Sequence, residues 1–201
     1  FVFMKKVKFI LRYFRYLLTA KNKHAAQAPF LYNFITTVLN AKKVDENCKK
    51  IEALRKELCD SEQIIQITDF GAGSSINNSK KRRVKDVARN SAKNKKFGQL
   101  LYRICRKFKP KNIIELGTSL GISSCYLAKA NPNTQVFTFE GCPETAAIAS
   151  SNFKKLDIEN ISITLGDFNN TLTSKLEEVD GVDLVFIDGN HQENPTIAYF
   201  E

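Results

Sequence analysis

The chain has 201 residues, of which 43% are hydrophobic and 26% charged, and this composition is typical of globular proteins rather than disordered chains. No stretch approaches the ~18 consecutive apolar residues of a membrane-spanning helix, so no transmembrane segment is expected. The five cysteines are an odd number without a C-x-x-C pair, which argues against a disulfide framework or a structural zinc site. We therefore expect a cytoplasmic protein in a reducing environment.

The two halves of the chain differ in charge. Residues 1–111 contain 27 Lys and Arg against 8 Asp and Glu, whereas residues 112–201 contain 4 against 13. The positive charge of the first half would favour binding to nucleic acid, to an anionic membrane surface or to an acidic partner. The alternative is that these lysines form a solvated face of a region that docks on an acidic domain. We expect a basic, mainly helical N-terminal extension at residues 1–94 and a second domain at residues 95–201.

The extension contains several predicted elements. Residues 4–19 predict an amphipathic helix, which suits either a membrane interface or packing on the rest of the protein or on a second subunit. Further helices are predicted over residues 29–40 and 46–59, with a strand at 64–68, and a helix over residues 97–108 is predicted at the start of the second domain. A glycine turn, Asp69-Phe70-Gly71-Ala72-Gly73-Ser74, follows this strand, so that residues 63–74 form a short strand and turn. The turn suits a sharp bend or flap, and a direct role at the substrate is the alternative.

The densest positive cluster is Lys80-Lys81-Arg82-Arg83. Four adjacent cations suit phosphate contacts with a nucleic acid, and a solvated helix start is the competing interpretation. No aromatic residue is interleaved with the cluster, so it offers no platform on which bases could stack.

From residue 112 onward, short apolar strands alternate with helices. Strands are predicted at residues 113–116, 135–140, 161–165 and 182–187, and helices at 122–130, 143–156 and 171–178. The strands are nearly all apolar, as in parallel sheets covered by helices on both faces. The expected fold is α/β, a Rossmann-like doubly wound parallel sheet.

In such sheets ligands bind at the carboxyl ends of the strands, and all four ends carry suitable residues. Glu115-Leu116-Gly117-Thr118-Ser119-Leu120-Gly121 closes the first strand, and its glycines let a ligand approach the backbone at a helix start. The glycine spacing is not that of dinucleotide-binding loops, and the carboxylate of Glu115 suits a cationic ligand better than a pyrophosphate.

The other three strand ends carry acids. Glu140 is placed to bind two ribose hydroxyls, Asp167 can accept from an adenine amino group, and Phe168 can stack on the adenine ring. Asp188-Gly189-Asn190-His191 ends the fourth strand. Each residue alone more often has a structural role, but four such ends in register predict a cofactor site.

The segments ELGTSLG, FTFEG, LGDF and VDLVFIDGNH resemble the S-adenosylmethionine-binding motifs of class I methyltransferases. Residues 97–121 also resemble O-methyltransferases related to the catechol type, and residues 24–92 resemble an N-terminal extension of methyltransferases from Bacteroidetes-type bacteria. The resemblance implies an S-adenosylmethionine-dependent methyltransferase that acts on an oxygen of a small-molecule acceptor.

The resemblance also implies individual roles at the cofactor. Glu115, Gly117, Thr118, Ser119 and Gly121 would form the loop around the methionine part. Glu140 would bind the ribose, Asp167 and Phe168 the adenine, and Asp188 would face the methyl group.

A divalent metal such as Mg²⁺ is bound by an Asp at the position of Asp188 in metal-dependent relatives. The partner ligands there come from the next strand of a seven-stranded sheet, and this sequence looks truncated after the fourth strand. Metal dependence is therefore left open. The apolar edge that the fourth strand would expose favours association into a homo-oligomer.

His191 is the candidate general base, because an imidazole with an unperturbed pKa of ~6.5 can take a proton from an acceptor hydroxyl near neutral pH. A histidine that caps the following helix is the alternative. Asp188 and His191 are thus the predicted catalytic pair. The competing functions are an RNA methyltransferase or RNA-binding protein that uses the basic half, and a non-catalytic module of the same fold.

Overall fold

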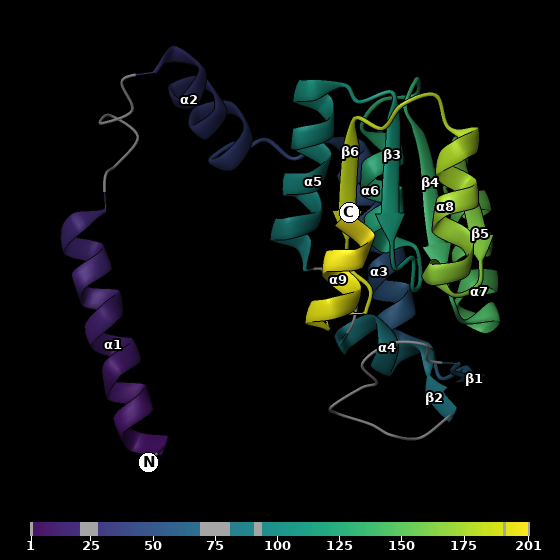
Figure 1. Cartoon of the computed structure of the whole chain (residues 1–201), viewed down its shortest axis with the longest axis horizontal. Coiled ribbons are helices and arrows are strands. Elements are labelled where there is room, and N and C mark those ends of the chain that lie inside the picture. Colours follow the sequence, from purple (N-terminus) through teal and green to yellow (C-terminus); the bar gives the residue numbers. More distant parts are fainter. Residues whose placement is uncertain (1, 21–27, 69–80, 91–93, 191, 201) are drawn as a thin grey trace. The chain divides into compact units, whose positions relative to one another are not determined.

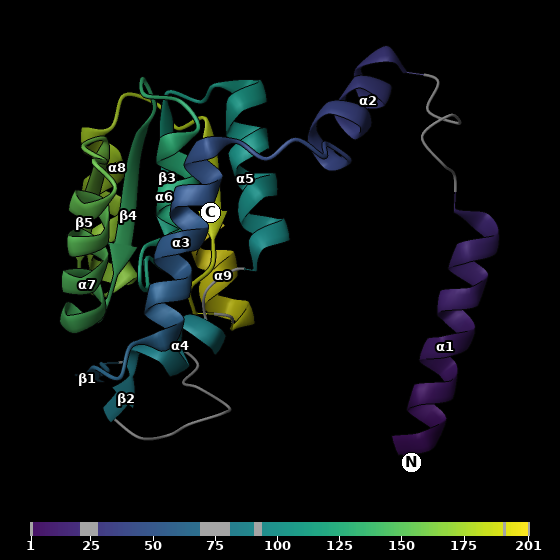
Figure 2. The same ribbon diagram turned by 180° about the vertical axis from the view of Figure 1, so that it is seen from behind.

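The computed structural model describes residues 2–20, 28–68, 81–90, 94–190 and 192–200 (Figures 1 and 2). The chain divides into two compact units, residues 1–42 and 43–201. The boundary expected between residues 94 and 95 lies inside the second unit, since residues 43–94 supply helices to its core.

The first unit is helical. Helix α1 spans Val2–Thr19, and helix α2, Pro29–Phe34, continues as the π-helix η2, Ile35–Leu39. Proline at the first turn of α2 is favourable there, because its φ is fixed near the helical value and its missing N–H would have no partner in the helix. The π-helix coincides with four consecutive β-branched residues, 35–38, whose side chains crowd an α-helix. Among the described residues, no helix is both long and apolar enough to span a bilayer.

The second unit is built on a four-stranded parallel sheet, which confirms the predicted α/β fold. Its strands are β3 (Asn112–Leu116), β4 (Gln135–Glu140), β5 (Ile161–Leu165) and β6 (Leu184–Ile187). The strand order is β5-β4-β3-β6, and every neighbouring pair is parallel. The chain first proceeds outward from β3 to β5 and then crosses to the other side of β3. The switch point, where parallel sheets bind ligands, therefore lies between β3 and β6.

Helices cover both faces of this sheet (Figures 1 and 2). Helices α6 (Ile122–Lys129) and α7 (Pro143–Lys155) lie on one face, and α8 (Phe168–Glu178) and α9 (Glu193–Phe200) lie on the other. Helix α8 begins three residues earlier than predicted, because Asp167 caps it by accepting a hydrogen bond from the backbone N–H of Asn169 at 3.0 Å.

The described residues between 43 and 94 contribute to the same core. Helix α3 (Glu46–Asp60) buries Ile51 and Leu54 in one cluster with Cys105 of α5 (Lys95–Phe108) and Tyr126 of α6. The Tyr126 hydroxyl lies 2.6 Å from Oε1 of Glu52 and donates to it, which ties α6 to α3. This part of the expected extension thus packs directly on the helices beside the sheet.

The basic cluster forms a strand rather than a helix start. Strand β2 (Lys81–Arg83) pairs antiparallel with β1 (Ile64–Gln66), and helix α4 (Val84–Asn90) follows it at once. Ile65, opposite Arg82, is buried, so the pairing anchors this basic strand to the core. The interpretation of residues 81–83 as a helix start was therefore wrong. These residues form a strand because they pair with residues 64–66, and a local sequence pattern does not reveal a pairing partner that far away in the chain.

The amino ends of β3 and β6 are fixed by one side chain. The carboxylate of Asp183 accepts hydrogen bonds from the backbone N–H groups of Lys111 at 2.7 Å and Asn112 at 3.1 Å. The side-chain amide of Asn112 donates in return to the carbonyls of Asp180 and Gly181. Since both strands are short, fixing their starts also aligns their carboxyl ends.

Candidate functional site

Backbone hydrogen bonds join the carboxyl ends of the four strands into one edge. The N–H of Gly117 donates to Phe139 at 3.0 Å, and the N–H of Asp188 donates to Leu116 at 2.8 Å. The N–H of Gly166 donates to Glu140 at 2.9 Å. The four predicted strand ends are therefore brought together, at the edge to which the arrowheads of β3 and β4 point in Figure 1.

The loop after β3 has an unusual backbone. Gly117, Ser119 and Gly121 have φ angles of 103°, 50° and 78°. A Cβ on Gly117 would lie 2.7 Å from the carbonyl oxygen of Asp188, and one on Gly121 would lie 2.5 Å from the ring of Phe153. Both glycines are thus required by contacts within the chain itself, in addition to any approach of a ligand.

Glu140 connects this loop to the end of β4. Its Oε2 accepts the backbone N–H of Ser119 at 2.6 Å, and its Oε1 accepts the N–H of Cys142 at 2.9 Å. A carboxylate can accept about four hydrogen bonds, so two hydroxyl groups of a ligand can still be bound. The side chain is half-buried, which leaves it accessible from the edge.

Strand β1 also reaches this edge, which sequence analysis missed. The N–H of Gln66 donates to Oε2 of Glu144 at 2.7 Å, and the N–H of Thr68 donates to the sulfur of Cys142 at 3.4 Å. Cys142 in turn donates from its thiol to the Gln66 carbonyl. The 69–74 turn that follows lies outside the described residues, so its predicted role stays a prediction.

Glu115 lies beneath the loop and is completely buried. Its Oε2 accepts from the hydroxyl of Ser124 and from that of Thr138, the latter at 2.7 Å. Thr138 must then accept from Thr118, whose hydroxyl lies 2.7 Å from it. Oε1 of Glu115 is buried and has no hydrogen-bond partner within the described part of the chain.

Burial controls the proton affinity of Glu115. Loss of water raises its pKa from 4.5 to about 7, although the nearby hydroxyl groups of Ser123, Ser124 and Thr138 favour the ionised form. The negative charge of Asp188 adds to the rise. Glu115 is therefore a carboxyl group poised to change its charge near neutral pH.

At the end of β5, Asp167 and Phe168 have structural contacts of their own. Oδ1 of Asp167 accepts both the backbone N–H and the side-chain amide of Asn169, each at 3.0 Å. The ring of Phe168 meets Phe139 and Tyr199 edge to face, with centroid distances of 6.4 and 5.7 Å. A Cβ on Gly189 would lie 2.7 Å from the Phe168 ring, so this glycine lets β6 and α8 approach closely.

At the end of β6, Asp188 is half-buried beside the glycine loop. Asn190 has a φ of 44° and donates from Nδ2 to the hydroxyl of Tyr199 at 3.0 Å. His191 lies outside the described residues, so its predicted role as the base stays a prediction. Across the described ranges, no three His, Cys, Asp or Glu side chains cluster as metal ligands would.

The predicted site residues fall into two groups by accessibility. Glu115, Thr118 and Gly121 are buried, whereas the remaining described ones are half-buried: Gly117, Ser119, Glu140, Asp167, Phe168 and Asp188. Thr138 and Ser124, which support Glu115, were not predicted. Thr138 could have been found from the sequence, because it is a lone hydroxyl residue between two phenylalanines of a predicted strand.

The basic cluster lies apart from these strand ends in the chain and is partly neutralised. Arg83 pairs with Asp86 at 2.9 Å and with Glu62 at 3.9 Å, and Lys85 also pairs with Glu62. Lys80 lies outside the described residues. These pairs reduce the charge available to phosphates, and nucleic-acid binding by residues 80–83 stays a prediction without further support.

Sequence comparisons bear on the second unit. Residues 114–201 match a family model described as a methyltransferase domain. A catechol O-methyltransferase of Niastella koreensis is 36% identical over 109 residues, which cover 53% of this chain and 47% of the relative. The chain thus spans about half the length of this curated relative.

Solved structures show the same fold. An O-methyltransferase of Bacillus cereus, solved in complex with SAH, superposes with a TM-score of 0.53 at 21% identity. The superposed region covers 84% of this chain and 63% of the Bacillus cereus chain. An SAH-bound methyltransferase of Podospora anserina has a TM-score of 0.52 at 19% identity, with coverages of 81% and 58%. At these identities the likeness concerns the fold alone.

Proposed function

We propose that this chain, which carries a methyltransferase domain at residues 114–201 on the class I methyltransferase fold, binds S-adenosylmethionine and methylates an oxygen of a small-molecule acceptor. The observation that carries the proposal is the single edge formed by the four strand ends. There the glycine loop, Glu140 and Asp188 are held together by backbone hydrogen bonds. The catechol O-methyltransferase relative supports oxygen as the acceptor atom.

The residues at this edge fit the parts of the cofactor. Glu140 keeps hydrogen-bonding capacity for the two ribose hydroxyls while holding the loop through Ser119. Asp167 uses one carboxylate oxygen, Oδ1, to cap α8, so the other can accept from the adenine amino group. Phe168 is half-buried beside Asp167, where it can contact the adenine ring.

The glycine loop holds the methionine part in our proposal. Gly117 and Ser119 are half-buried and contribute their backbone, while Thr118 and Gly121 support the loop from inside. The ionised form of Glu115 would favour a positively charged ligand above it. Helix α6 starts directly after the loop without a side-chain cap, so its first N–H groups point toward this edge.

The bound cofactor supplies a methyl group carried on a positively charged sulfur. We propose that His191 removes the proton from the acceptor hydroxyl as its oxygen bonds to the methyl carbon and the bond from carbon to sulfur breaks. Asp188 positions the reacting groups from the end of β6.

Isothermal titration calorimetry of the 201-residue chain tests the cofactor assignment. S-adenosylmethionine and S-adenosylhomocysteine should bind at one site per chain, and neither NAD nor ATP should compete. Binding of NAD in place of S-adenosylmethionine would show that the strand-end acids serve another nucleotide. Transfer of a radiolabelled methyl group to a panel of phenols, amines and RNA then distinguishes an oxygen acceptor from the alternatives.

A further inference from the structure

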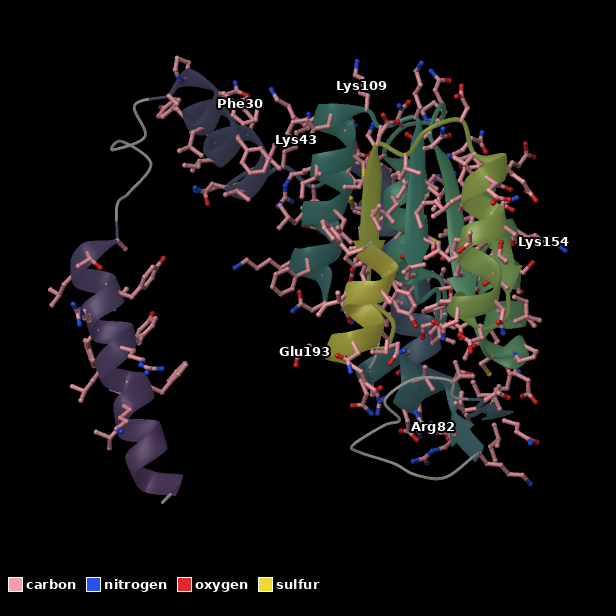
Figure 3. The ribbon with its side chains drawn as sticks, viewed as in Figure 1. Phe30, Lys43, Arg82, Lys109, Lys154 and Glu193 are labelled. Carbon is pink, nitrogen blue, oxygen red and sulfur yellow. The ribbon has the colours of Figure 1, made fainter. Side chains whose placement is uncertain are left out.

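From residue 7 to residue 18, helix α1 has a wide apolar surface and a narrow basic one. Between residues 7 and 18 it contains only three basic side chains, Lys8, Arg12 and Arg15, whose i, i+4, i+7 spacing places them on one face. The other nine side chains are large and apolar or aromatic, and their exposed fractions range from 38% to 88%: Val7, Phe9, Ile10, Leu11, Tyr13, Phe14, Tyr16, Leu17 and Leu18. Figure 3 shows side chains projecting to both sides of this helix.

The charge of this region has one sign. Residues 1–44 contain nine Lys and Arg and not a single Asp or Glu. The segment therefore offers no anion of its own to its cations, and a negatively charged surface is complementary to it.

The width of the apolar surface of α1 suggests that a lipid bilayer, rather than another helix, covers it. Helix packing covers a stripe of roughly 100° or somewhat more, whereas the apolar residues of α1 surround more than half of the helix. An interfacial helix can bury this whole arc among lipid headgroups and acyl chains, while Lys and Arg extend to the phosphates. Since no described helix can cross a bilayer, α1 would lie along the surface.

A second apolar element follows α1. Residues 28–41 carry no charged side chain, and Phe30, Leu31 and Tyr32 of α2 are 62%, 45% and 44% exposed. Lys42 and Lys43 come directly after this uncharged stretch. The pattern of an apolar element flanked by cations is thus repeated within the first unit.

We propose that α1, together with α2 and η2, binds the surface of an anionic lipid bilayer, with α1 lying in the plane of the headgroups. This inference rests on the first unit alone and is independent of the proposed methyltransferase activity. It gives the N-terminal basic region a lipid partner instead of a nucleic acid.

Vesicle flotation of the whole chain tests the proposal. The wild type should float with vesicles of phosphatidylcholine and phosphatidylglycerol but not with phosphatidylcholine alone, and added salt should weaken the binding. The triple change Lys8→Glu, Arg12→Glu, Arg15→Glu should lower partitioning by roughly a hundredfold or more, from about 1 kcal/mol per cation.

A matched control variant distinguishes the effect of the charges on α1 from the effect of the total charge of the chain. Lys95→Glu, Lys96→Glu, Lys154→Glu changes three exposed lysines of the second unit and lowers the formal net charge from +10 to +4, as the α1 variant does. Lys154 projects outward from the second unit in Figure 3. This variant should bind vesicles almost as the wild type does, and an equal loss in both variants would overturn the role of α1.

A second measurement reports insertion directly. The chain contains no tryptophan, so Phe14→Trp places a single tryptophan on the apolar surface of α1. Its emission should shift to the blue with anionic vesicles, whereas Phe108→Trp, at a residue of similar exposure in the second unit, should not respond. A blue shift of Phe14→Trp without vesicles, together with dimers that persist when vesicles are added, would instead show that a second copy covers α1.

Discussion

Gly117 at the end of β3 lies against the backbone of Asp188 at the end of β6, and a Cβ on Gly117 would come within 2.7 Å of the Asp188 carbonyl oxygen. The glycine loop and the Asp188 turn are therefore held together by the absence of a side chain. We predict that Gly117→Ala separates them and weakens binding of S-adenosylhomocysteine, measured by calorimetry.

Gly181→Ala is the control for backbone strain alone. Gly181 also has a positive φ, 74°, but nothing lies within 4 Å of a Cβ placed there. Each change should destabilise the protein in urea by about 1–2 kcal/mol through φ strain, and Gly117→Ala should cost more because of the added clash. Equal effects of the two changes on cofactor binding would contradict the importance of the Gly117–Asp188 contact.

Glu140→Gln should weaken S-adenosylhomocysteine binding by about 1–3 kcal/mol, the usual cost of hydrogen bonds to a charged group left unmade. Part of that loss arises because an amide can replace only one of the two oxygens that accept from Ser119 and Cys142. Glu144→Gln removes the same charge four residues later, where the carboxylate serves Gln66, and should leave the affinity unchanged. Equal losses from both would mean that net charge, rather than ribose binding, sets the affinity.

Glu115 should make the protein less stable as the pH rises from about 4.5 to about 7. Its pKa in the folded state is about 7 against an ordinary 4.5, so the folded state holds the proton more tightly in this range. The free energy of unfolding should therefore fall by about 3 kcal/mol across it, and Glu115→Gln should remove this fall. Urea unfolding of the wild type and of Glu115→Gln between pH 4.5 and 8 provides the measurement. If the free energy of unfolding depends on pH identically in both proteins, a group other than Glu115 is responsible for that dependence.

His191→Ala should lower methyl transfer by about 10²–10⁴-fold and leave cofactor affinity almost unchanged, if His191 is the general base. The wild-type rate should rise with pH through the imidazole pKa, because only neutral imidazole accepts a proton. Asp188→Ala should differ by lowering both turnover and cofactor affinity. Near-normal turnover of His191→Ala would leave this residue as a helix-start histidine.

The sequence by itself determined the parallel sheet and the positions of its strand ends. Strands at 135–140 and 161–165 were predicted to the residue, because runs of apolar residues between polar turns are a local signal. The acids Glu140 and Asp188 were located for the same reason, since a strand end is defined by where its apolar run stops.

Tertiary structure decided which residues contact one another at this edge. The pairing of Lys81–Arg83 with Ile64–Gln66, the clash that excludes a side chain at Gly117, and the hydroxyls that surround Glu115 all join residues from different elements. The burial of α3 beside α6 likewise placed this helix of the expected extension in the core. Such contacts depend on how elements pack in space, and local periodicity carries no information about a partner that lies elsewhere in the chain.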